Sequence, residues 1–319
     1  MAFDETKTID VSIYKQEQKR LWDDFVSVSK NGFFLFYRDY MEYHSDRFHD
    51  HSLLFFKNGN LIGVLPANLN DGVLYSHAGL TFGGVVSGYD MRTQRMLAIF
   101  EKLTQHCREQ EIRKIVYKAI PYIYHSIPAD EDLYALFRNK AELSGRNVTT
   151  SIYGPSKLKF DESRSRAIKK AKKNNLAVKR SYDFKSFMQI VEDVLKERHG
   201  VAPVHTSREI ELLAGRFPDN IKLFSSFKND AMLAGAMIYE SKNVAHAQYI
   251  ANSSEGRDMG ALEMVFDELI NNYFKNKKYF DFGISTEQAG QYLNTGLVAH
   301  KEGFGARAVM QDFYELEIK

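Results

Sequence analysis

The stretch NVAHAQYIANSSEGRDMGALEMVFDELINNYFKNKKYFDFGI (243–284) decides the fold. It begins with a β-rich run (243–250), passes through a glycine-bearing loop (251–260) and continues with apolar residues at helical spacing (260–275). A second β-rich run, KYFDFGI (278–284), ends the stretch. This order predicts a strand, a helix and a second strand of one α/β unit.

The residues before this stretch add a hairpin and two helices. IKLFSSFKNDAMLAGAMIYE (221–240) consists of two apolar runs about a short polar turn, which predicts a β-hairpin. Apolar residues at helical spacing predict helices near 183–197 and 206–216. The predicted unit therefore begins with helices and continues through a hairpin into the α/β segment.

The first half of the chain has the same order of predicted elements. SLLFFKNGNLIGVLPANL (52–69) has two apolar runs about an Asn-Gly turn, the strongest short-range signal for a hairpin. The other predicted elements are a helix over 15–30, a strand over 73–77, a glycine-rich loop, a helix over 91–110 and a strand over 114–120. Because matching elements recur at a nearly constant offset, we predict two copies of one supersecondary plan.

The two copies define the predicted fold class and domains. We predict an α/β protein with mixed sheets, built from an N-terminal domain (1–155) and a C-terminal domain (156–319). The boundary falls where Gly154-Pro155 interrupts the chain. The last strand of the chain is also able to join the first sheet.

Composition excludes several classes of protein. With 319 residues, 44% hydrophobic and 26% charged, the chain has the composition of a globular protein. Its one cysteine, Cys107, excludes an intrachain disulfide and a cysteine-rich zinc site. No apolar run approaches the ~18–20 residues that span a bilayer, and the acidic start MAFDETKTID lacks the basic and apolar segments of a signal peptide. We therefore expect a soluble, cytoplasmic protein without a transmembrane segment.

One run of the chain is strongly basic, although the net charge is only +2. The sequence SRSRAIKKAKKNNLAVKR contains eight cations and no acid, and its apolar residues predict an amphipathic helix over 162–175. Such a run fits three interpretations, which are a solvated face, contact with anionic lipid, and a docking site for a phosphate-rich partner. Coenzyme A, a nucleotide-sugar and tRNA are the phosphate-rich partners that we consider.

The loop over 251–260 is the first candidate binding site. The N-terminus of the helix that follows presents unpaired N–H groups and the positive end of the helix dipole, which suit a pyrophosphate. Gly256 and Gly260 would let the backbone approach the phosphates, and Arg257 adds a charged donor. A plain connection between strand and helix is the alternative interpretation.

The hairpin, strand, GRDMGA loop, helix and strand together resemble the core of the GNAT acyltransferases. The acyl-CoA loop of that family reads Arg or Gln, two residues, Gly, one residue, Gly or Ala; Arg257 and Gly260 match it and the small Ala261 follows, but Leu262 stands where the final small residue belongs. The resemblance implies two tandem GNAT-like domains and an acyl-CoA donor such as acetyl-CoA. The donor-binding residues that it implies are Gly256, Arg257, Met259, Gly260 and Ala261.

The duplicated core and the C-terminal segment FDFGIST…GLVAHKEGFGARAV are similar to the Fem-type tandem GNAT proteins. The best known of these add amino acids to peptidoglycan precursors from aminoacyl-tRNA. The resemblance implies that Tyr292, in a short helical stretch, protonates the leaving thiolate and that Lys301 contacts the carbonyl or phosphate of the donor. Glu287 and His246, each near a strand end, are the candidate bases.

A cluster of histidines raises the question of a metal site. His44, His49 and His51 lie close to Asp46 and Asp50 in EYHSDRFHDHS, but no second ligand group of suitable spacing follows. We therefore expect no metal. We predict instead that this segment lines the acceptor side of a cleft and that AGLTFGGVVSG shapes the acceptor pocket.

The sequence thus predicts a metal-independent N-acyltransferase that moves an acyl group from acyl-CoA to an amine. Two alternatives stay open. In the first, the donor is aminoacyl-tRNA, bound by the basic helix over 162–175, and the acceptor is a cell-wall precursor or a similar peptide or sugar. In the second, the chain is a non-catalytic module that binds a polyanion on a GNAT fold.

Overall fold

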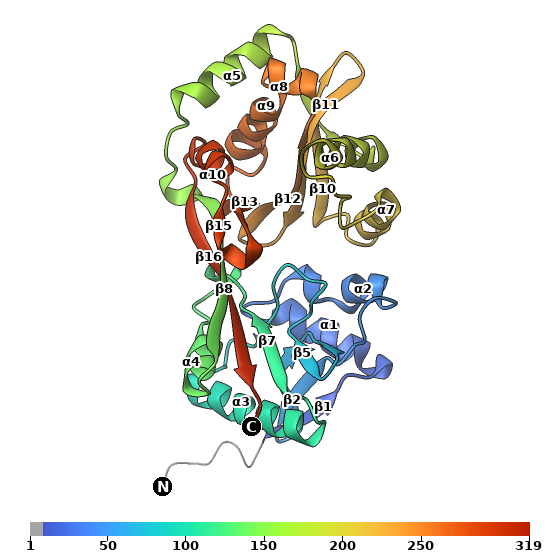
Figure 1. Cartoon of the computed structure of the whole chain (residues 1–319), viewed down its shortest axis with the longest axis vertical. Coiled ribbons are helices and arrows are strands. Elements are labelled where there is room, and N and C mark those ends of the chain that lie inside the picture. Colours follow the sequence, from blue (N-terminus) through green and yellow to red (C-terminus); the bar gives the residue numbers. More distant parts are fainter. Residues whose placement is uncertain (1–8) are drawn as a thin grey trace. The chain divides into compact units, whose positions relative to one another are not determined.

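The computed structural model describes residues 9–319 and divides the chain into two units, whose elements are labelled in Figure 1. Unit 1 comprises Met1–Asn147, Glu287–Tyr292 and Met310–Lys319, and unit 2 comprises Val148–Thr286 and Leu293–Val309. Most of the acidic start that argued against a signal peptide lies outside the described residues. No helix within residues 9–319 has the length and apolar character needed to cross a bilayer.

Unit 2 contains one mixed sheet, and its predicted hairpin and strand–helix–strand order are confirmed. In pairing order its strands are β8 (Glu142–Tyr153, from Val148 on), β13 (Tyr279–Ile284), β12 (Val244–Asn252), β11 (Ala231–Glu240), β10 (Ile221–Lys228) and β9 (Ala177–Ser181). The β12–β13 pair is parallel, and the other neighbouring pairs are antiparallel.

Helices cover both faces of the unit 2 sheet (Figure 1). On one face, Phe266 of α9 (Ala261–Glu268) packs edge-on against the rings of Phe280 and Phe282. On the other face, Phe187 of α6 (Phe184–His199) lies directly over Gly235 of β11. The other α-helices described in this unit are α5 (Glu162–Lys173), α7 (Ser207–Arg216), α8 (Ser254–Met259) and α10 (Thr295–Glu302).

Unit 1 repeats this order of pairings, in agreement with the predicted duplication, but its sheet is interrupted. One sheet contains β1 (Ile9–Ile13), β2 (Leu53–Lys57), β3 (Asn60–Leu65) and β6 (Val86–Ser87). A second contains β4 (Asn68–Asn70), β5 (Val73–Tyr75), β7 (Lys114–Lys118) and β16 (Arg307–Glu317, from Met310 on), with β5 and β7 parallel. Pro66 lies between β3 and β4. Because proline lacks a backbone N–H, the strand that corresponds to β11 is divided here.

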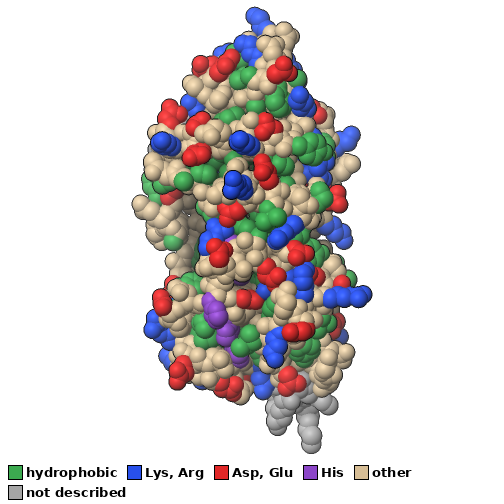
Figure 2. Space-filling model, turned by 90° about the vertical axis from the view of Figure 1, so that its right-hand side faces the viewer, with side chains coloured by type: hydrophobic (Ala, Val, Ile, Leu, Met, Phe, Trp, Pro, Cys, Tyr) green, Lys and Arg blue, Asp and Glu red, His purple; other side chains and the backbone are tan. Residues whose placement is uncertain are grey.

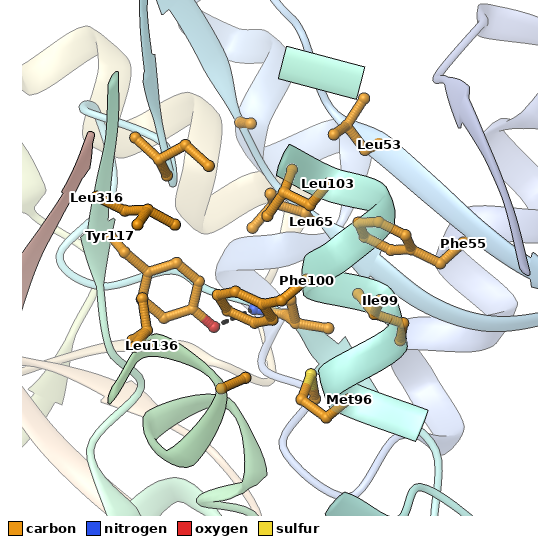
Figure 3. Packing of buried hydrophobic residues seen from close by; sticks show 14 of the residues in the cluster. Leu53, Phe55, Leu65, Met96, Ile99, Phe100, Leu103, Tyr117, Leu136 and Leu316 are labelled. Atoms are coloured by element: carbon orange, nitrogen blue, oxygen red, sulfur yellow. Dashed lines mark hydrogen bonds between the residues drawn. The ribbon is translucent and has the colours of Figure 1, made fainter. Parts of the chain in front are cut away.

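The core of unit 1 forms around its longest helix, α3 (Thr93–Glu109), which confirms the helix predicted over 91–110. Figure 3 shows Met96, Ile99, Phe100 and Leu103 of α3 directed into this core, with Phe100 beside the ring of Tyr117 on β7. The other α-helices described in unit 1 are α1 (Lys19–Val28), α2 (Arg38–Met41) and α4 (Glu131–Arg138).

Two local predictions were wrong. The segment 251–260, predicted as a loop, contains the six-residue helix α8, whose N-terminus is capped by the Ser253 hydroxyl accepting from the Gly256 N–H (3.0 Å). A helix this short shows no apolar periodicity, so the sequence pattern could not reveal it. Tyr292, predicted in a helical stretch, begins the two-residue strand β15 (Tyr292–Leu293).

Candidate functional site

The two parallel strands of unit 2 separate part-way along their length. Their last paired residues are His246 on β12 and Asp281 on β13, although β12 continues beside β11 as far as Asn252. Before this point β12 is fully buried, whereas residues 248–250 are half-buried. On β13, Ile284 is 43% exposed. We call the ends of β12 and β13 that no longer pair with each other, residues 247–252 and 282–284, the strand fork.

A histidine and a carboxylate meet where the strand fork begins. His246 Nδ1 lies 2.6 Å from Asp281 Oδ2, and 11% of the His246 side chain remains exposed. The carboxylate fixes Nδ1 as the protonated ring nitrogen, so Nε2 is left as a proton acceptor. Of the two bases predicted from the sequence, His246 therefore has the geometry of a general base.

Asp281 is held by two further side chains. Its Oδ1 accepts hydrogen bonds from the hydroxyls of Thr149 (2.6 Å) and Ser151 (2.7 Å), both on β8. Burial by itself would raise the pKa of this carboxyl group, but the hydrogen bonds from His246 and from the two hydroxyls together hold the pKa below its usual value. Asp281 is therefore an ionised group inside the protein.

Lys301 reaches the same strand from α10. It is 3% exposed, and its Nζ donates to the carbonyl oxygens of Gly283 (2.8 Å) and Ile284 (2.6 Å) at the end of β13. Burial lowers the pKa of Lys301 to about 8, and the charge of Asp281 partly opposes this shift. Lys301 is therefore a buried lysine and not a solvated one.

A tyrosine lies beyond His246 on the same strand. Gln248 forms a bulge in β12, after which Tyr249 pairs with Met237 just as His246 pairs with Tyr239, so both side chains lie on one face. The Tyr249 hydroxyl is 2.7 Å from His205 Nδ1. Burial raises the pKa of Tyr249 to about 12, so this phenol keeps its proton at neutral pH.

The loop over 251–260, which we call the donor loop, has glycines that pack against other groups of the folded chain. A side chain on Gly260 would begin 2.4 Å from the carbonyl oxygen of Ala167, and one on Gly256 would begin 2.4 Å from Asn252 Oδ1. For a pyrophosphate to approach the backbone here, the space beside each glycine would have to be open. The loop as folded therefore does not fit the pyrophosphate of coenzyme A.

The other predicted donor-loop residues also have partners inside unit 2. Arg257 Nη1 donates to the carbonyl of Asn252 (3.1 Å), and Arg257 Nη2 lies 3.9 Å from Glu197. Met259 packs against the hydrophobic core and Ala261 is fully buried in it. Each side chain contributes to the folding of the segment between β12 and α9.

The remaining predicted site residues lie elsewhere. Glu287 and Tyr292 are exposed, and both belong to the short segment that groups with unit 1. Of the clustered histidines, His44 is buried with Nδ1 2.6 Å from the Met41 carbonyl, and His51 Nε2 is 3.0 Å from His106 Nε2. Figure 2 shows histidine side chains on the lower part of the face that it draws. Within residues 9–319, no three His, Cys, Asp or Glu side chains are arranged to hold a metal ion.

A family model described as an acetyltransferase (GNAT) domain matches residues 159–292, which include α5, the donor loop, His246 and Asp281. This part of the chain therefore matches the GNAT acetyltransferase family. The expectation of a GNAT acyltransferase is thereby confirmed, and the donor is not specified by the match. No curated protein matches the sequence of this chain.

Solved structures extend the likeness over both units. The structure of FemX has a TM-score of 0.69 at 13% identity and covers 97% of each chain. The C-terminal domain of a putative lysylphosphatidylglycerol synthetase from Agrobacterium fabrum has a TM-score of 0.61 at 10% identity, covering 94% of this chain and 92% of that one. A tandem GNAT protein from the clavulanic acid biosynthesis pathway has a TM-score of 0.54 at 9% identity, covering 98% and 99%. The predicted tandem GNAT fold is confirmed.

The sequence singled out His246 and Lys301 as candidates, but not the residues that surround them in the structure. Asp281 sits in the predicted strand KYFDFGI, and Thr149 and Ser151 come from a strand that was not predicted. The position of Asp281 in an otherwise apolar strand was the one available signal, because a lone carboxylate in a buried strand needs a partner.

We expect the stability of unit 2 to depend on Asp281 in acid. The folded-state pKa of Asp281 lies below its unfolded value. The free energy of unfolding that ionised Asp281 contributes is therefore present above the unfolded pKa of about 4 and is lost as the pH falls through the folded-state pKa. Urea unfolding of Asp281→Asn between pH 3 and 6 should therefore give a flatter dependence on pH than the parent chain. The exposed Asp230→Asn should keep the parental dependence, and equal slopes for all three chains would contradict the role given to Asp281.

Proposed function

We propose that the GNAT domain transfers an acyl or aminoacyl group from an ester or thioester donor to an amine. The observation that carries this proposal is the buried His246–Asp281 pair at the start of the strand fork. The donors predicted from the sequence, acyl-CoA and aminoacyl-tRNA, both present an activated carbonyl carbon, so the chemistry below applies to either. The acceptor is the amine of a small molecule, peptide or sugar.

The reaction needs a base for the amine. In the proposed step the amine nitrogen attacks the carbonyl carbon of the donor while its proton passes to His246 Nε2. Asp281 keeps the imidazole oriented and stabilises the imidazolium that forms. When the tetrahedral intermediate collapses, the bond to the donor sulfur or oxygen breaks, and the leaving atom takes a proton.

Lys301, on α10, supports the proposal through its contacts with the end of β13. Two of its three N–H groups bind the carbonyls of Gly283 and Ile284, which fixes the end of β13. We propose the third for the carbonyl oxygen of the donor, where a positive charge in a buried setting stabilises developing negative charge. This role agrees with the one that the Fem-type resemblance implies for Lys301.

Replacing the proposed base gives the first test of function. The chain is incubated with acetyl-CoA or with bulk aminoacyl-tRNA and a panel of primary amines, and mass spectrometry detects the amide. With an active pair, we expect His246→Gln and Asp281→Asn to lower kcat by about 10²–10⁴-fold with little change in KM. Asp230→Asn should match the parent, whereas a large loss in Glu287→Gln with none in His246→Gln would assign the base to Glu287.

The proton for the leaving atom has two candidate sources. Tyr292 is the tyrosine implied by the family resemblance, and Tyr249 is the protonated phenol on the same strand face as His246. We expect Tyr249→Phe to lower kcat by about 10-fold or more. The exposed Tyr182→Phe serves as control. A loss confined to Tyr292→Phe would assign the proton to Tyr292 instead.

A second candidate function, binding of a polyanion, is favoured by the exposed side of α5. Arg164 and Lys172 of this helix pair with Glu263 and Asp267 of α9. The other cations of α5 are exposed, and none of them forms an ion pair with a described acid on another element; these are Arg166, Lys169, Lys170 and Lys173. On the face drawn in Figure 2, by contrast, basic and acidic side chains are mixed. Together with the resemblance to Fem-type proteins, this supports tRNA as the polyanion.

Charge reversal tests this binding. Changing Lys169, Lys170 and Lys173 to Glu should weaken binding of bulk tRNA by about 1 kcal/mol per cation at low salt, and the loss should shrink as salt rises. Filter binding at two salt concentrations measures the effect. Because these side chains are exposed, the variant should fold as the parent does, and parental affinity would identify α5 as a solvated face.

A further inference from the structure

The donor loop and the helix α5 meet at the N-terminus of α9. Gly260 has a φ of +74° and joins α8 to α9. The space into which its side chain would extend is taken by the backbone of Ala167, whose carbonyl oxygen and carbon would lie 2.4 and 3.0 Å away. Gly260 is therefore required for close packing of α5 against this junction.

The second glycine of the loop is closed in the same way. A side chain on Gly256 would meet Asn252 Oδ1 at 2.4 Å and the carbonyl oxygen of Leu233 at 2.6 Å. Both groups belong to the neighbouring strands of the sheet. The Cβ side of each glycine is therefore filled by groups of the folded chain.

Several contacts hold α5 in this position. Arg164 Nη1 donates to Glu263 Oε1 on α9 and to His300 Nδ1 on α10, both at 2.7 Å. The two side chains of the Arg164–Glu263 pair are only 18% and 12% exposed, so water screens it little. Ile168 and Ala171 lie on the buried face of α5. Just before the helix, the Asp161 N–H donates to the carbonyl of Gly303 (2.8 Å).

The N-terminus of α9 already has negative groups of the protein beside it. The first turn of a helix attracts negative charge, which a phosphate supplies in many nucleotide-binding folds. Here the partial negative charge of the Ala167 carbonyl and the carboxylate of Glu263, in the first turn of α9, are already present. A bound pyrophosphate would have to compete with groups of the protein.

We infer that α5 occupies the place of the donor pyrophosphate, so that this chain transfers its acyl group from a carrier other than coenzyme A. The inference rests on the proposed acyl transfer and defines the donor class of that reaction. The donor is recognised by its acyl group and by the atoms around the reacting carbonyl at the strand fork. Residues 256–261 hold the helices together and do not contact the donor.

The test is a calorimetric titration of the full chain with acetyl-CoA. We expect no saturable heat up to about 1 mM ligand, and hydrogen exchange of residues 254–264 should be unchanged by the ligand. A micromolar Kd with protection of these residues would overturn the inference. Transfer from acetyl-CoA in the amide assay would also overturn it while leaving the proposed function intact. Absence of transfer from every donor would reject the proposed function, and the titration would still decide whether coenzyme A binds.

A matched pair of alanine variants tests the packing on which the inference depends. Gly260→Ala places a methyl group against the Ala167 carbonyl at a strained φ, so the Tm of unit 2 should fall by about 5 °C or more. Gly200→Ala, at the end of α6, places a methyl group at a similarly strained φ of +66° but meets nothing within 4 Å, so its Tm should fall by much less. A Gly260→Ala chain that fails to fold supports the same contact. Equal Tm values for both variants would show that the loop is open and would overturn the inference.

Discussion

The carboxylate of Asp281 is the constraint on which the candidate site depends. It is 2% exposed, and a buried charge is tolerated only where it is paired and hydrogen-bonded. The partners come from both neighbouring strands, with His246 on β12 and the hydroxyls of Thr149 and Ser151 on β8. Because all three must face Asp281 at once, the register of three strands and the orientation of the imidazole are fixed together. A change in the sheet at this point would also change the geometry of the base.

Local sequence signals predicted most of the fold. The Asn-Gly turn located the first hairpin, and apolar spacing located α3, α6, α7 and α9, because these elements bury a periodic face. The signals that failed were those without a period. The helix α8 spans six residues, and the break between β3 and β4 depends on how Pro66 is used in the sheet. Such features are determined by tertiary packing, which a single sequence does not report.

The site was harder to predict because its contacts join distant residues. Asp281 and its hydroxyl partners are 130 and 132 residues apart, and Arg164 and Glu263 are 99 residues apart. Their residue types are common, so no local pattern distinguishes them. Gly260 illustrates a different difficulty. A glycine before a helix allows either a phosphate or another backbone to approach, and both uses leave the same mark in the sequence.

The two units use one plan of strands, but only in unit 2 does the parallel pair end at a histidine and a carboxylate. In unit 1 the last residues of the parallel pair are Tyr75 and Val116, which supply neither a base nor a carboxylate. The chain then folds back between the strands, where the Gly83 N–H donates to the carbonyl of Lys118 (2.9 Å) and Lys118 Nζ donates to the carbonyl of Ala78 (3.2 Å). In unit 2, Lys301 reaches from a helix to the end of the strand. In unit 1, Lys118 comes from the strand itself and holds a loop beside the strand end. The duplicated architecture therefore does not imply two reactive centres, since in unit 1 backbone fills the space that the proposed reaction requires.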